Sequence, residues 1–251
     1  MQIATRLTNL PDCIAIGKLT LSEAQLAQAT QLKNQILANG GYVEQQAICV
    51  SQVHEHMTQL SYVVSDYATI RSLRAEGLKV ASIGSGTFLC CPERQQILLQ
   101  RRSASADIYP HKLACFGGHY SPDRPTHGFG TLLDTLIDEL QEEAGFNLLD
   151  LKIDFAHDLP PTFFILETDT GGIQYSPLAF ALTPEQADQI QGSDEGAVET
   201  FHLVNDLEIL LNKENWSQMG YSCFETWREL GFPVQKGWQG KQINTSKPFN
   251  V

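Results

Sequence analysis

Three glutamates stand close together in the stretch 131–146, TLLDTLIDELQEEAGF. In a helix, Glu139, Glu142 and Glu143 have the i, i+3 and i+4 spacing that puts carboxylates on one strip of the surface, where like charges repel. A divalent cation would relieve that repulsion, because Mg²⁺ or Mn²⁺ takes carboxylate oxygens and keeps positions for water and phosphate. The spacing therefore fits a metal site, although on spacing alone a solvated acidic face is the simpler interpretation.

The same stretch carries the apolar periodicity of a helix that packs on one side. Its apolar side chains recur at i, i+3, i+4 and i+7, at Leu133, Leu136, Ile137, Leu140 and Ala144. Gly145 follows as the residue that would end the helix in a left-handed conformation. We expect a helix whose apolar face packs on a sheet and whose acidic strip lies beside that face.

Strand patterns surround this helix, and we expect residues 79–251 to form an α/β domain. The turn PERQ at 92–95 joins the first two strands into a hairpin, and CFETWRELG at 223–231 predicts a C-terminal helix. The segments rich in β-branched and aromatic residues predict strands at 80–91, 95–103, 151–159, 162–169, 175–183 and 197–204.

Residues 1–78 differ in character and are expected to form an α+β extension of the domain. Thr20 and Glu23 have the spacing of a capping box, which predicts a helix that runs to Asn39. Two further segments predict strands, at 42–51 and 59–67. The sequence leaves three roles open for this extension: covering the site, supplying a homodimer interface, or extending the sheet.

Composition and charge exclude several classes of partner. The chain has 251 residues, 42% of them hydrophobic, and can bury a proper core. A formal net charge of −12 argues against a nucleic-acid partner, which usually needs a basic surface. No apolar run approaches the roughly 20 residues of a membrane-spanning helix, and the start lacks the features of a secretory signal. We expect a cytoplasmic protein that contacts no membrane and keeps its six cysteines as reduced thiols.

The segment ELQEEAGF at 139–146 resembles the end of the signature helix of the Nudix hydrolase superfamily, E-U-x-E-E-x-G-U, where U is a bulky aliphatic residue. YPHKLACFGGHY at 109–120 is similar to the strand and paired glycines that precede that helix, and QQILLQRRS at 95–103 to the strand before those. The resemblance covers roughly residues 79–210. It implies a Nudix-type α/β/α sandwich, with a mixed sheet between helices.

The match departs in three places from the full family pattern, G-x5-E-x7-R-E-U-x-E-E-x-G-U. Glu139 follows Gly118 by 21 positions instead of 15, so the loop between them holds about six extra residues, which loops absorb at small entropic cost. Asp138 stands at the arginine position, and Gly130 stands where the first glutamate belongs. In the family those two residues usually support each other and orient the metal ligands. Here the support must come from elsewhere, or the site is looser.

The resemblance also implies roles for individual residues. The helix glutamates would hold Mg²⁺ or Mn²⁺, and two glycines would let the backbone approach the metal and the diphosphate of a substrate. The metal ligands would be Glu139, Glu142 and Glu143, and the glycines Gly117 and Gly118.

Attack of water on phosphorus needs a carboxylate that accepts a proton. The resemblance implies a base on the helix, for which Glu139 and Glu142 are the catalytic candidates, or an acidic residue on a later loop. On the loop GSDEGAVETF, Glu195 is the catalytic candidate, beside Asp194 and Glu199, and the alternative is that these acids only solubilise the loop.

Two arginines end the predicted strand 95–103, and because strand side chains alternate, one of them should point inward. Arginine forks suit phosphate oxygens, which makes Arg101 and Arg102 candidate substrate-binding residues. An outward salt bridge is the alternative.

Three functions remain open at this point. The resemblance implies a metal-dependent hydrolase that cleaves the diphosphate linkage of a small-molecule nucleoside diphosphate linked to another group, X. The elements RRS, YP and GGH and the lengthened loop are similar to members that act on nucleotide sugars. The departures at Gly130 and Asp138 favour, as an alternative, a degenerate Nudix domain that binds a nucleotide or protein partner without turnover. A structural or interaction module is the third possible function.

Overall fold

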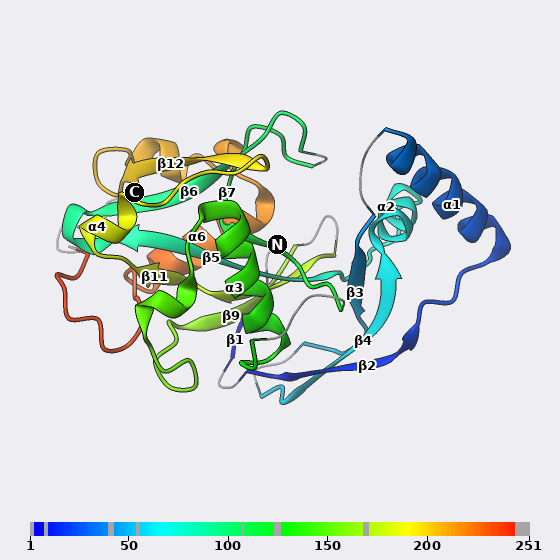
Figure 1. Cartoon of the computed structure of the whole chain (residues 1–251), viewed down its shortest axis with the longest axis horizontal. Helices are drawn as coiled ribbons and strands as arrows, with labels where there is room; N and C mark the ends of the chain where they lie inside the picture. Colours follow the sequence, from blue (N-terminus) through cyan, green and yellow to red (C-terminus); the bar gives the residue numbers. More distant parts are fainter. Residues whose placement is uncertain are drawn as a thin grey trace.

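A mixed sheet carries the larger part of the molecule in the computed structural model, which describes residues 3–7, 10–39, 43–53, 56–106, 108–122, 127–167 and 171–243. Among these residues, six strands form its main path (Figure 1). Their order is β1 (Ile3–Arg6), β9 (Thr162–Leu166), β10 (Ile173–Pro177), β5 (Ile83–Cys91), β6 (Gln96–Arg102) and β12 (Gly196–His202). Three short strands add to it: β7 (Leu113–Ala114), β8 (Phe116–His119) and β11 (Ala179–Ala181).

The long strand β5 organises this sheet because its two halves have different neighbours. Its first half lies between β10, which is parallel to it, and β8, which is antiparallel. Its second half lies between the parallel β11 and the antiparallel β6. The β5–β6 hairpin turns through a short 3₁₀ helix at Pro92–Arg94, which confirms the turn predicted from PERQ.

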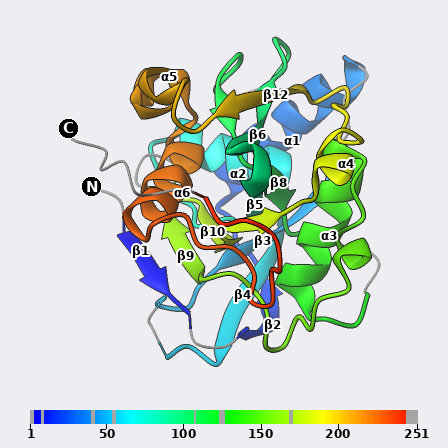
Figure 2. The ribbon, with the colours of Figure 1, turned by 90° about the vertical axis from the view of Figure 1, so that its left-hand side faces the viewer.

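Helices cover both faces of the sheet, and the alternation of side chains along the strands explains why. Leu89 and Leu98 pack with the apolar face of α3 (Thr131–Ala144). The residues beside them in the strands, among them Phe88 and Ile97, pack with α6 (Gln218–Glu229) on the opposite face. Figure 2 shows the sheet between α3 and α6. The predicted α/β architecture, a mixed sheet between helices, is confirmed.

Most of the first 78 residues form a smaller unit beside the main sheet (Figure 1). It contains a sheet in the order β2 (Asp12–Lys18), β4 (Gln59–Asp66) and β3 (Gln45–Cys49), with α1 (Glu23–Ala38) and α2 (Tyr67–Ala75). The amide of Ala47 donates to the carbonyl of Tyr120 at 3.2 Å, and that of Cys49 to the carbonyl of Ala81 at 2.7 Å. Strand β1 pairs with β9 in the main sheet, so the N-terminal segment is tied to the rest of the chain by its first strand and by β3.

Two local predictions differ from the structure, and one helix was missed. The N-cap of α1 is Ser22, which forms a capping box with Gln25, rather than Thr20 with Glu23. The segment 151–159 is not a strand: it follows a 3₁₀ helix at Leu148–Leu151 and continues in turns. Helix α2 was not predicted. Positions 42, 168 and 169, at the ends of two predicted strands, and 123–126 of the lengthened loop lie outside the described residues.

The remaining helical segments are short and belong to the second half of the sequence. They are α4 (Pro184–Ala187), α5 (Leu207–Leu211) and a 3₁₀ turn at Lys213–Asn215. Within the described ranges, no helix is long and apolar enough to cross a membrane. The six cysteines are free thiols, and all except Cys13 are buried.

Candidate active site

Helix α3 places Glu139 and Glu143 against the sheet, whereas Glu142 is exposed. It starts after Gly130 and ends at Gly145, whose φ of 62° confirms the left-handed cap predicted from the sequence. Near its start, the hydroxyl of Ser85 in β5 donates to the carbonyl of Leu132 at 2.5 Å. The helix is thereby fixed over the strand that runs through the middle of the sheet.

The carboxylate of Glu139 lies directly against Gly118 in β8. A Cβ atom added at Gly118 would stand 2.4 Å from the carboxyl carbon and from both carboxylate oxygens. Glu139 is only 5% exposed, so this position leaves the carboxylate little freedom to move away. Gly118 was expected to let its backbone approach the metal and the diphosphate, and the group that lies against it in this structure is the Glu139 carboxylate.

Gly117 admits an equally close contact, on the other side of β8. A Cβ there would stand 2.0 Å from the carbonyl oxygen of Ser85, and its φ of 144° disfavours an L side chain. Its amide donates to the carboxylate of Glu143 at 2.5 Å. The paired glycines thus serve two different glutamates.

Glu143 is held in the interior by hydrogen bonds. It is 2% exposed and accepts from the side-chain amide of Gln100 at 2.7 Å, in addition to the Gly117 amide. Burial, and then the charge of Glu139, raises the pKa of this carboxyl well above its usual range, while the two donors act in the opposite direction. Sequence reasoning missed Gln100, because nothing in a strand pattern marks a buried amide as a partner of a helix residue.

A cleft of about 690 Å³ opens beside these residues. Its acidic part is lined by Glu139 and Glu142 of α3 and by Glu195. Gly117, Gly118 and Arg102 line it as well, whereas Glu143 lies behind them and is not among the lining residues. The charges of Glu139 and Glu195 nevertheless act on Glu143, so these three carboxylates influence one another.

The two arginines at the end of β6 have different surroundings. Arg102 lines the cleft, and its Nε donates to the carbonyl of Ile108 at 3.1 Å. Arg101 forms a two-pronged ion pair with Glu199 of β12, at 2.7 and 2.8 Å, and donates to the carbonyl of His111. Arg101 therefore follows the salt-bridge alternative and is not among the described lining residues of the cleft.

Glu195 reaches the cleft from the loop before β12. The amide of Ser103, the residue after β6, donates to the carbonyl of Glu195 at 2.9 Å, and the amide of Glu195 donates to the hydroxyl of Ser193. These bonds hold the loop at the end of the strand that carries Arg102. The side chain of Glu195 itself is exposed.

The two substitutions among the three departures from the family pattern have structural explanations. Gly130 has a φ of 98°, and a Cβ there would stand 2.9 Å from Leu10, so the backbone and the N-terminal segment both disfavour a side chain. Asp138 pairs with His127 at 2.6 Å, and so fastens the end of the lengthened loop to α3. Neither position supports the helix glutamates in the way that the family pattern does.

A further wall of the cleft comes from the N-terminal unit, which fits the first of the three roles left open for it, covering the site. Arg71 and Arg74 of α2 line it, together with Tyr67 and with Glu44, which precedes β3. Glu167, at the end of β9, also lines it. No local pattern could have found these residues, since only the packing of the small unit on the main sheet brings them to the cleft.

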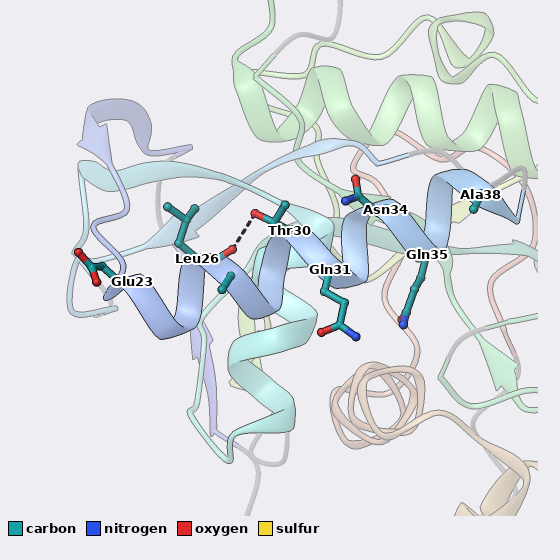
Figure 3. A pocket seen from close by; sticks show the side chains of 8 residues that line it. Glu23, Leu26, Thr30, Gln31, Asn34, Gln35 and Ala38 are labelled. Atoms are coloured by element: carbon teal, nitrogen blue, oxygen red, sulfur yellow. Dashed lines mark hydrogen bonds between the residues drawn. The ribbon is translucent and has the colours of Figure 1, made fainter.

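A second hollow lies along the outer face of α1 (Figure 3). Glu23 is its charged lining residue, and the others are amides, small residues and Leu26. The hydroxyl of Thr30 donates to the carbonyl of Leu26 at 2.7 Å, as Figure 3 shows. This hollow offers no pair of groups that could exchange a proton or neutralise a phosphate, so the cleft is the candidate site.

The residues of the cleft suit Mg²⁺ or Mn²⁺ in chemistry, since carboxylate oxygens are their preferred protein ligands. Within the described ranges, no three His, Cys, Asp or Glu side chains stand close enough together to hold a metal ion. Mg²⁺ is commonly held by one or two carboxylates, with water and substrate phosphates at the other positions. Glu139 and Glu142, which line the same part of the cleft, meet that smaller requirement.

No protein-family model matches the sequence, and no curated protein matches it either. Among solved structures, similar folds are those of a MutT protein from Methanosarcina mazei Go1 (TM-score 0.39, 18% identity, covering 59% of this chain and 94% of that chain) and a NUDIX hydrolase from Nitrosomonas europaea (0.38, 14%, 62% and 93%). A bifunctional NMN adenylyltransferase/ADP ribose pyrophosphatase from Francisella tularensis gives a TM-score of 0.46 at 17% identity, over 64% of this chain and 44% of that chain. These likenesses concern the fold of part of the chain, and they assign no activity to it.

Proposed function

We propose that the chain is a metal-dependent hydrolase that cleaves the diphosphate linkage of a nucleoside diphosphate joined to a second group, X. The observation that carries the proposal is the joint lining of one cleft by Glu139 and Glu142 of α3, Glu195 and Arg102. Carboxylates for a cation, a further carboxylate and a guanidinium are the groups that hydrolysis of a diphosphate requires. The resemblance of 139–146 to the Nudix signature points to the same reaction.

Each residue has a separate task in this proposal. Glu139 and Glu142 would hold Mg²⁺ or Mn²⁺, which when bound would neutralise phosphoryl oxygens and make a water molecule more acidic. Gly118 keeps the Glu139 carboxylate in place, since a side chain at 118 would displace it. Arg102 would bind a phosphoryl oxygen, because a guanidinium fork matches phosphate geometry.

Glu195 is the proposed proton acceptor. It lines the cleft together with Glu139 and Glu142, and it comes from a loop that backbone hydrogen bonds fix to the end of β6. Its exposed carboxylate can pass a proton to bulk water, whereas Glu143 is buried and already accepts two hydrogen bonds. Glu143 would instead act as a positioning residue, through the Gly117 amide and Gln100.

Hydrolysis of a panel of nucleoside diphosphate compounds, with Mg²⁺ or Mn²⁺ and with EDTA as the control, tests the proposal. We expect turnover that needs the ion and that Glu142→Gln abolishes; Glu142 is exposed, so this variant should fold as the wild type does. Ligand-induced thermal stabilisation without turnover would instead favour a domain that only binds nucleotides. Gly130 and Asp138 are the reason for this alternative, because neither residue can support the glutamates as in the family pattern.

A further inference from the structure

A pair of thiols lies at the cleft, and neither thiol has a task in the proposed hydrolysis. Cys115 stands between β7 and β8 and lines the cleft, and Cys223 belongs to α6. The side-chain amide of Gln174 donates to both sulfurs, at 3.0 Å to Sγ of Cys115 and at 3.9 Å to Sγ of Cys223. The thiol of Cys223 is also hydrogen-bonded to Cys115, so the two sulfurs are direct neighbours.

The two cysteines meet because α6 approaches β7 closely at a glycine. A Cβ atom added at Gly220 would stand 3.1 Å from the Cα atom of Ala114. Cys223 comes about one helical turn after Gly220, and Cys115 directly follows Ala114. The close contact of the two backbones therefore extends to the two cysteines.

The strand that Gln174 crosses fixes its side chain. Gln174 belongs to β10, and β5 lies between β10 and β8. The amide nitrogen of Gln174 lies against Gly86 of β5, where an added Cβ atom would collide with it. A glycine in the middle strand thus lets an amide from β10 reach a thiol beside β8, and the thiol pair has a donor in a fixed position.

Cys115 is the more acidic of the two thiols. The hydrogen bond from Cys223 lowers the pKa of Cys115, and the Gln174 amide and the charge of Arg102 act in the same direction, against the effect of burial. The pKa of Cys223 is raised, first by its hydrogen bond to Cys115 and then by burial. Because the thiolate is the reactive form of cysteine, Cys115 is the nucleophile and Cys223 keeps its proton.

The other four cysteines have different surroundings. They are Cys13, Cys49, Cys90 and Cys91, and none of them is among the described residues that line the cleft. Burial is the largest influence on each of them, and it raises the pKa of all four thiols. A small polar oxidant that enters the cleft would therefore meet Cys115 in its most reactive form and would find the other four thiols shielded.

We propose that Cys115 and Cys223 form a reversible oxidation site, which a peroxide converts into a disulfide at the cleft. The Cys115 thiolate attacks one oxygen of hydrogen peroxide, the O–O bond breaks, and the departing hydroxide takes up a proton to become water. Cys115 is then a sulfenic acid. The Cys223 sulfur attacks it, so that the S–S bond forms as the S–O bond breaks, and the hydroxide leaves with the Cys223 proton as a second water. The thiols lose two electrons, and the peroxide gains them.

The disulfide acts on the proposed metal site through β8. Phe224 and Trp227 anchor α6 in the core, so the segment around Cys115 is the part that yields. The sulfurs must close from hydrogen-bonding distance to a bond of about 2.05 Å. Two positions after Cys115 stands Gly117, whose amide donates to Glu143. This consequence, unlike the oxidation itself, rests on the proposed function: we expect the oxidised protein to bind Mn²⁺ more weakly.

Peptide mapping of the full chain by mass spectrometry tests the oxidation site. The protein is treated with hydrogen peroxide, unfolded, alkylated and digested without a reductant. We expect a disulfide between Cys115 and Cys223, with the other four cysteines alkylated, and dithiothreitol should restore both thiols. This measurement needs neither metal nor substrate, so its result does not depend on the hydrolase function.

Cys223→Ser removes the thiol that resolves the sulfenic acid and keeps a hydroxyl donor for Cys115. After peroxide treatment, dimedone should trap a sulfenic acid at Cys115 in this variant and much less of it in the wild type. Cys13→Ser is the matched control, because burial raises the pKa of Cys13 to about 12 and the residue does not line the described part of the cleft. It should form the disulfide as the wild type does. The wild-type map decides the proposal even if Cys223→Ser fails to fold.

The outcomes separate the oxidation site from the function beside it. Thiols that stay reduced in peroxide, a disulfide between other cysteines, or direct oxidation of Cys115 to a sulfinic acid would overturn the proposal. Calorimetry should show that the oxidised protein binds Mn²⁺ at least about tenfold more weakly than the reduced protein. Equal affinity at complete disulfide formation would overturn the link to the metal site. If the reduced protein binds no Mn²⁺, the proposed function fails, and the peptide map still decides the oxidation site.

Discussion

The carboxylate of Glu139 and the backbone of Gly118 are in such close contact that a single methyl group would separate them, since a Cβ at 118 would fall 2.4 Å from the carboxyl carbon. The two residues come from α3 and β8, elements that are consecutive in the chain and joined by the lengthened loop. Their contact fixes the acidic helix against the sheet at the point where the cleft begins.

Gly118→Ala should therefore displace the Glu139 carboxylate. We expect Mn²⁺ affinity, measured by calorimetry, to fall at least about tenfold, in the range found when residues that orient metal ligands are changed. Gly231→Ala is the control: Gly231 has a φ of 78° and open space around it, so alanine should lower stability by about 1 kcal/mol without reaching the metal. Unchanged Mn²⁺ affinity in Gly118→Ala would remove Glu139 from the site.

Arg101 and Arg102 are neighbours in sequence with separate tasks, and their alanine variants should differ accordingly. Arg102→Ala should raise KM for a nucleoside diphosphate substrate about tenfold, since it removes a charged donor from the cleft. Arg101→Ala should leave KM unchanged and lower the free energy of unfolding by less than about 1 kcal/mol, because its pair with Glu199 is about one third exposed. Equal changes in KM would show that Arg101 also contacts the substrate.

Local sequence patterns predicted those elements whose own residues determine them. The apolar spacing in α3 and Gly145 at its end both report burial on one side of a helix, and the structure has both. The strand prediction for the segment 151–159 was wrong for a related reason. Leu151, Ile153 and Phe155 alternate with polar residues and pack against the α3 cluster, but no strand within the described part of the chain pairs with them. Alternation predicts burial on one side, and only a partner makes it a strand.

The residues of the candidate site also fall into two groups, those that a local pattern could predict and those that only the whole fold brings together. The spacing on one helix predicted an acidic strip of three glutamates, of which Glu139 and Glu142 line the cleft while Glu143 is buried behind it. The Gln100–Glu143 bond joins residues 43 positions apart, and Arg71 and Arg74 reach the cleft only because the small sheet packs on the large one. Contacts of this kind depend on the whole fold and leave no periodic trace in the sequence.

Glu143 should make the stability of the metal-free protein depend on pH. Its pKa is raised in the folded state, chiefly by burial, so the folded protein holds this proton more tightly than the unfolded chain does. The contribution of Glu143 to the free energy of unfolding is then greatest below its ordinary pKa of 4.5, and it decreases as the pH rises from there to the raised pKa. Urea unfolding in EDTA between pH 5 and about pH 8 should show this decline.

Glu143→Gln removes the titrating group and keeps an acceptor for the Gly117 amide. We expect this variant to lose the part of the pH dependence that Glu143 causes and so to gain stability relative to the wild type as the pH rises, with the Gln100 amide then facing an amide nitrogen instead of a carboxylate oxygen. Mn²⁺ should stabilise the wild type more than the variant, because the charge of Glu143 adds to the field of Glu139. Parallel pH profiles of the two proteins would contradict the assignment.

Repair of the signature at position 130 should fail. Gly130→Glu places a side chain on a residue with a φ of 98°, where its Cβ would stand 2.9 Å from Leu10. We expect a loss of about 1–3 kcal/mol in the free energy of unfolding, and no gain in activity, since backbone strain and overpacking act together. Adding Leu10→Ala should recover only part of that loss, because it removes the clash and leaves the backbone strained. A Gly130→Glu variant that is both as stable as the wild type and more active would contradict this prediction and show that the family's first glutamate can be accommodated here.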